Sequence, residues 1–220
     1  MKSRSIFITS PDCFESTSLR NPVRTLDHTL KLHFPDYYRV NYDTKLLADK
    51  EATATEKQFP FYNDYRERFG SPDISVLDAA ITEGRSIFLN GFNQEQFLYI
   101  APRLRETAEI IYFFKCPKIY DLSALSQFAN LKCVHIYWNN SLQHLWDMSG
   151  NKALQVLSFV SITKLSDIAT LKESCVEYIC FDSSDNTGHA KKCLFDQSVF
   201  RDMMNLKHLS LVYSDLKSNE

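Results

Sequence analysis

The sequence is poor in glycine and has no long apolar run. Only 5 of its 220 residues are glycine, and no glycine-rich phosphate-binding loop occurs. No apolar stretch approaches the roughly 18 residues of a membrane-spanning helix, so no membrane partner is expected. The apolar run of residues 6–8 is too short for a secretory signal, and Pro11 closes it. Neither sign of charge dominates, since 25 Lys and Arg face 27 Asp and Glu, which argues against a nucleic acid partner.

Paired cysteine motifs are also missing. The 6 cysteines show no C-x-x-C spacing and stand in apolar runs, where free buried thiols are common. Cys175 with Cys180, and His189 with Cys193, do not have the spacing of a zinc knuckle. We therefore expect reduced thiols, a cytoplasmic location, no metal and no cofactor.

What the sequence does contain is a repeat in its second part. Overall, 44% of residues are hydrophobic and 24% charged, as in ordinary globular proteins. From residue 85 onward the pattern L-x-x-L-x-L-x-x-(N/C) recurs roughly every 23 residues. Its copies begin at Ala108, Leu131, Leu154, Val176 and Leu206. The last interval is longer because it contains the polar insert 182–189.

Apolar residues between these copies keep a spacing of three, as in Leu122, Leu125 and Phe128. Alternation in the copies and a spacing of three between them predict strands joined by 3₁₀ or extended return segments. Asp121 and Asp167 precede two such segments and are predicted to cap short helical turns.

These motifs resemble the leucine-rich repeat superfamily. Residues 119–131 and 164–171 look like the return segments of its short internalin-like class, and the resemblance covers about residues 85–216. Asn139 fills the asparagine position of the repeat, and Cys116 is an accepted substitute there. The resemblance implies an α/β fold, a solenoid of about five to six repeats with a parallel sheet on its concave side, and non-catalytic binding of another protein.

The first 84 residues contain no repeat. Residues 5–9 predict a short strand, and residues 71–84 predict a helix with Ser71 as N-cap and Pro72 at its first position. A solenoid needs caps at its ends, so residues 1–84 are expected to form an α-rich N-terminal cap. The alternative is a lobe that folds over the concave face. A helix over about residues 94–101, capped by Asn93, is predicted to open residues 85–220.

The concave sheet face supplies the candidate site. Equivalent positions of successive strands form a column, because neighbouring parallel strands lie about 4.8 Å apart. One predicted column contains Phe88, Tyr112, His135, Ser158, Cys180 and Ser210. The N-terminal repeats are rich in aromatic residues, and aromatic anchors often carry binding energy. The predicted partner-binding residues are Phe88, Tyr112, Phe114, His135, Tyr137, Trp138 and Tyr178.

Two other functions remain open. A thiol enzyme or sensor would use Cys133, His135 or Cys180, although no nucleophile elbow or H-E-x-x-H motif occurs and the sequence favours a non-enzyme. The other is a structural oligomer in which the aromatic patch is a subunit interface. Few residues follow the last repeat, so its strand is also expected to pair with a second copy in a homodimer, with Leu211 and Tyr213 near the axis.

Overall fold

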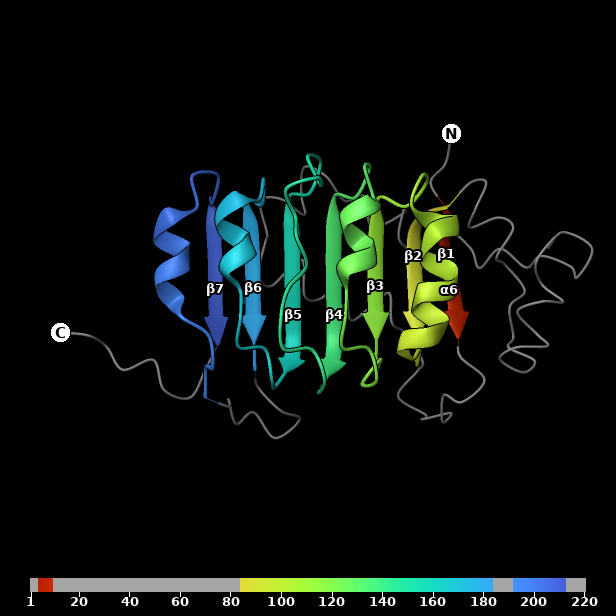
Figure 1. Cartoon of the computed structure of the whole chain (residues 1–220), viewed down its shortest axis with the longest axis horizontal. Helices are drawn as coiled ribbons and strands as arrows, with labels where there is room; N and C mark the ends of the chain where they lie inside the picture. Colours follow the sequence, from red (N-terminus) through yellow and green to blue (C-terminus); the bar gives the residue numbers. More distant parts are fainter. Residues whose placement is uncertain (1–3, 10–83, 184–191, 213–220) are drawn as a thin grey trace, which may run out of the picture.

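The computed structural model describes residues 4–9, 84–183 and 192–212, which form one parallel β-sheet. Each strand lies beside its neighbour in sequence, in the order β1 to β7 (Figure 1). The strands are β1 (Arg4–Thr9), β2 (Gly84–Asn90), β3 (Ile110–Phe114), β4 (Cys133–Asn139), β5 (Val156–Ile162), β6 (Tyr178–Asp182) and β7 (His208–Val212). The parallel sheet and its helices confirm the α/β class.

Helices in the segments between strands lie on one side of this sheet (Figure 1). They are α6 (Gln94–Leu104) and the 3₁₀ helices η3 (Ser123–Gln127), η4 (Ala169–Glu173) and η5 (Gln197–Asp202). The predicted cap of α6 is confirmed, because the Asn93 side chain accepts from the Gln96 N–H and the Gln96 side chain accepts from the Asn93 N–H, both at 2.9 Å.

The predicted aspartate caps are present too. Asp121 Oδ1 accepts a hydrogen bond from the Ser123 N–H at 2.7 Å, and Asp167 Oδ1 accepts one from the Ala169 N–H at 3.0 Å. Asp196 bonds the Ser198 N–H in the same way before η5. Each short helix therefore begins with one of its backbone donors bonded to a carboxylate.

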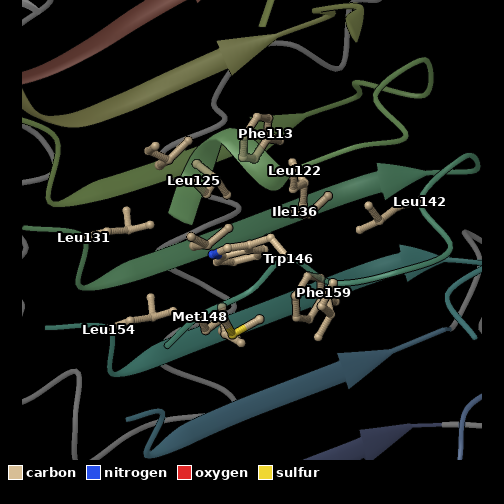
Figure 2. Close-up of a cluster of buried hydrophobic side chains, with 14 of the residues drawn as sticks. Phe113, Leu122, Leu125, Leu131, Ile136, Leu142, Trp146, Met148, Leu154 and Phe159 are labelled. Atoms are coloured by element: carbon tan, nitrogen blue, oxygen red, sulfur yellow. The ribbon is translucent and has the colours of Figure 1, made fainter. Parts of the chain in front are cut away.

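The core lies between the sheet and the return segments. Strand residues that the repeat pattern points inward are buried from β2 to β6, and so are the return-segment residues spaced by three, whereas those of β7 are partly exposed. Figure 2 shows part of this core, with return-segment side chains packed toward β3, β4 and β5. It includes Trp146, which lies outside the sequence pattern and whose indole Nε1 donates to Asn151 Oδ1 at 2.8 Å.

Strand register agrees with the sequence pattern throughout the repeats. Phe88, Tyr112, His135, Ser158, Cys180 and Ser210 are paired in succession from β2 to β7. A shift of one residue would turn the apolar side chains to the opposite face, so burial of one face holds this register in place.

Buried amides join successive units. The Asn139 Nδ2 donates to the carbonyl oxygens of Cys116 and Ile119 at 2.8 and 2.7 Å, and its Oδ1 accepts from the N–H groups of Ser141 and Leu142 at 2.8 Å each. These bonds satisfy backbone groups that the turns would otherwise bury without partners.

Asn151 has a similar role on the return side, where its Nδ2 donates to the carbonyl oxygens of Leu125 and Phe128 at 2.9 Å. Gln94 also bridges two segments, because its side chain bonds backbone groups of Tyr120 and Asp121. The repeat pattern pointed to Asn139 but gave no signal for Asn151 or Gln94.

The N-terminal part contributes directly to the sheet. The predicted strand at 5–9 is β1, which pairs in parallel with β2. Residues 10–83, including most of the predicted helix 71–84, lie outside the described residues. Gly84, expected to end that helix, is the first residue of β2.

Candidate functional site

The middle of the sheet face opposite the helices, here called the outer face, is buried. Tyr112, His135, Ser158 and Cys180 all have 0% exposure, and the rings of Tyr112 and His135 pack edge-on at 4.5 Å. Tyr112 and His135 were predicted as partner-binding residues, and both side chains are buried in this structure. Strand alternation identifies the face on which a side chain lies but does not tell whether that face is covered.

The same burial bears on the thiols of this face. Loss of hydration and, to a smaller extent, the negative charge of Asp182 raise the pKa of Cys180 to about 12, although the hydroxyls of Ser210 and Ser158 act in the opposite direction. Cys133 also has 0% exposure. A nucleophilic cysteine needs an accessible thiolate with a lowered pKa, whereas Cys180 is buried and its pKa is raised.

Accessible aromatic surface remains where β4 ends, at the half-buried Tyr137 and the exposed Trp138, whereas Phe114 at the end of β3 is buried. Phe114 and Tyr137 stack at 5.2 Å with an interplanar angle of 12°. Next to them, Trp138 is 44% exposed, and Lys115 Nζ lies 5.6 Å from the centroid of its ring. Phe114, Lys115, Tyr137 and Trp138 are called the strand-end surface below.

A recurring backbone conformation shapes this surface. Four residues at the ends of β2 to β5 have a positive φ angle. Gly91 and Lys115 directly follow β2 and β3, with φ angles of 69° and 49°. Trp138 and Ser161 are the second-last residues of β4 and β5, with φ angles of 59° and 57°. This left-handed conformation costs a residue with a side chain roughly 1–2 kcal/mol. The sequence did not reveal it, because Gly91 is the only residue of the four that favours it.

Backbone hydrogen bonds connect these left-handed residues to the next strand. The Gly91 N–H donates to the Phe114 carbonyl at 3.0 Å, and the Lys115 N–H donates to the Tyr137 carbonyl at 2.9 Å. The backbone under Trp138 is therefore fixed by the repeat, and the indole projects from a rigid support.

The remaining predicted site residues are divided by the fold. Phe114, Tyr137 and Trp138 come together, and Lys115 joins them. Tyr178 is half-buried at the first position of β6, at the opposite end of the strands. The Phe88 side chain lies outside what the structure describes, although its backbone pairs with Tyr112 in β3.

A groove of about 430 Å³ lies between α6 and η3, and sequence reasoning did not find it. It is lined by residues that include Leu98, Arg105, Ser123 and Phe128. Arg105 already contacts Glu106 at 3.1 Å. The groove therefore provides no pair of acid and base groups for chemistry.

Other kinds of site were also sought. Among residues 4–9, 84–183 and 192–212, no three His, Cys, Asp or Glu side chains cluster in a way that would hold a metal ion. Within the same described ranges, no helix has the length and apolar character to cross a membrane. Comparisons with protein family models, with curated proteins and with solved structures return no match.

Proposed function

We propose that this protein is a leucine-rich repeat protein that binds another protein through its strand-end surface. Three features support the repeat class: the parallel sheet in sequence order, the 3₁₀ return helices, and the amide bridge of Asn139 at the asparagine position of the repeat. Cys116 supports it as well, since its thiol donates to the Leu89 carbonyl at 3.4 Å from the equivalent position.

One observation carries the binding proposal, namely the exposed Trp138 on a left-handed backbone. Trp138 is 44% exposed, so the fold gains less from it than from a fully buried tryptophan. Its φ of 59° adds a cost that glycine at the same position would avoid. A tryptophan that stays accessible and projects from a fixed backbone suits a role as a binding anchor.

The neighbours of Trp138 suit a protein partner. Tyr137 is held by stacking on Phe114, so ordering its side chain on binding would cost little entropy. Lys115 adds a cation close to two aromatic rings, with its Nζ 5.4 Å from the Phe114 centroid. Aromatic residues are enriched in the centres of protein interfaces, and a lysine beside them suits the polar rim.

A thiol enzyme is less well supported. The buried Cys180, with its pKa raised to about 12, would stay protonated near neutral pH. This argues against Cys180 as a nucleophile, and our proposal is binding without catalysis.

Capture of partners from a lysate of the native cells tests this proposal. We expect Tyr137→Ala combined with Trp138→Ala to lose partners that the wild type captures, because each lost anchor costs about 2 kcal/mol of binding free energy. The matched control is Tyr120→Ala, which removes an aromatic ring that is 63% exposed elsewhere. Identical sets of captured proteins for all three would contradict the proposal, and so would unfolding of the double variant.

A further inference from the structure

The last repeat unit leaves apolar side chains in water. Leu209 and Val212 of β7 are each 36% exposed, Met204 is 94% exposed, and Leu194 is 52% exposed. At the equivalent position in the middle of the sheet, Leu157 has no exposure. These residues belong to β7 or to the segment before it, and β7 is the edge strand of the described sheet (Figure 1).

Backbone directions in β7 show which groups face that edge. The His208 N–H donates to the Glu177 carbonyl at 3.0 Å, and the Val212 carbonyl accepts from the Ser183 N–H at 3.0 Å, so both residues face β6. Backbone groups alternate in direction along a strand, so those of Leu209 and Leu211 point away from β6. Within the part of the chain that the structure describes, β6 is the only strand beside β7.

This edge lacks the features that usually prevent strand pairing. The five residues of β7, HLSLV, include no proline, lysine or acidic residue. Two lysines near it are paired within the chain, with Lys207 Nζ 2.9 Å from Glu177 and Lys172 Nζ 2.5 Å from Asp202. These two lysines therefore add little repulsion where two identical edges meet.

We propose that the β7 edge binds a second copy of this chain, with the two β7 strands antiparallel about a two-fold axis at Ser210. The outward-facing residues are placed symmetrically about Ser210, so Leu209 of each copy lies opposite Leu211 of the other. Each such pair exchanges two backbone hydrogen bonds, which gives four across the axis. With the axis perpendicular to the sheet, the two cores become continuous and the exposed leucines are covered.

Sedimentation of the full chain tests this dimer. At tens of micromolar we expect the wild type to be a dimer. Leu211→Pro removes an N–H that faces the edge but leaves the ladder to β6 intact, and we expect it to raise the dimer Kd at least 100-fold. The matched control, Leu211→Ala, keeps the N–H and should raise the Kd less than tenfold. A monomeric wild type would overturn the proposal, as would a dimeric Leu211→Pro.

Hydrogen exchange of the wild type gives a second readout that does not depend on the folding of the proline variant. The amides of Leu209 and Leu211 should exchange at least tenfold more slowly at 200 µM than at 2 µM, because only the dimer protects them. Unprotected Leu209 and Leu211 amides at 200 µM would refute the dimer, and so would equal protection at both concentrations in a chain that sediments as a monomer.

Discussion

The middle repeat units and the last one are built on the same pattern but differ in how completely they are buried. Leu157 of β5 lies between two complete units and has no exposure, whereas Leu209 of β7 is exposed at the edge of the described sheet. Phe181 of β6 marks the transition, since it stacks on Phe159 at 4.9 Å and contacts Phe195 of the last unit at 4.8 Å. An inward leucine of a repeat therefore contributes fully only when a further unit packs against it.

The largest effect that separates the two regions should come from truncating these leucines. Leu157→Ala should lower the free energy of unfolding by about 2–5 kcal/mol, because it leaves a cavity in a closed core. Leu209→Ala should cost less than about 1.5 kcal/mol, because much of that side chain is already in water. Urea unfolding of both variants measures the difference, and equal losses would show that the two units are equally well packed.

The second-largest loss of stability should come from removing the amide bridge of Asn139. Asn139→Ala removes four hydrogen bonds to buried backbone groups and should cost about 2–4 kcal/mol, because those groups lose their partners. The neighbouring Asn140→Ala is the control. Asn140 accepts one bond from the Thr163 hydroxyl at 3.1 Å, so this change should cost less than about 1 kcal/mol. Comparable losses in the two variants would mean that the bridge is not what joins the units.

A smaller, pH-dependent effect on the free energy of unfolding is expected from Cys180 on the outer face. The pKa of Cys180 is raised to about 12 in the folded chain, above the 9.0 of an ordinary thiol. Folding therefore favours the protonated thiol, so its contribution is complete below pH 9 and declines as the pH rises from 9 towards 12. Between pH 8 and pH 10 the wild type should lose about 1 kcal/mol more than Cys180→Ala. Parallel pH profiles of the two proteins would show that the thiol is hydrated.

The smallest change in stability is expected at the strand-end surface. Trp138→Gly relieves the left-handed backbone but gives up the packing of the indole and increases the entropy of the unfolded chain. Relief of the backbone raises the free energy of unfolding, whereas the other two effects lower it. The net change should be less than about 1 kcal/mol, while capture of partners is lost. A loss of several kcal/mol would place Trp138 in the core and remove the argument for its role in binding.

The sequence predicts the strands, their register and the helix that begins at Gln94, because alternation, a spacing of three and the Asn93 cap are local signals. It cannot predict the burial of His135, which depends on more than strand alternation. It also misses Asn151, because an amide on the return side has no fixed place in the repeat. The left-handed turn at Trp138 escapes for a similar reason, since the repeat holds this backbone against the residue's own preference.

For the candidate site, the sequence identifies the aromatic residues but not which of them remain accessible. Phe114, Tyr137 and Trp138 were predicted with Tyr112 and His135 as one surface. In the structure Tyr112, His135 and Phe114 are buried, whereas Tyr137 and Trp138 are accessible where β4 ends. Accessibility of this kind depends on how the whole chain packs, and no local spacing records it.

Native-state hydrogen exchange at about 1 µM tests the contrast between the units most directly. The amides of β4 and β5 should exchange only on global unfolding, and those of β7 should exchange through local opening that costs at least about 2 kcal/mol less. Equal protection of β5 and β7 at this low concentration would contradict the account, because it would show that the last unit is as completely packed as the middle ones.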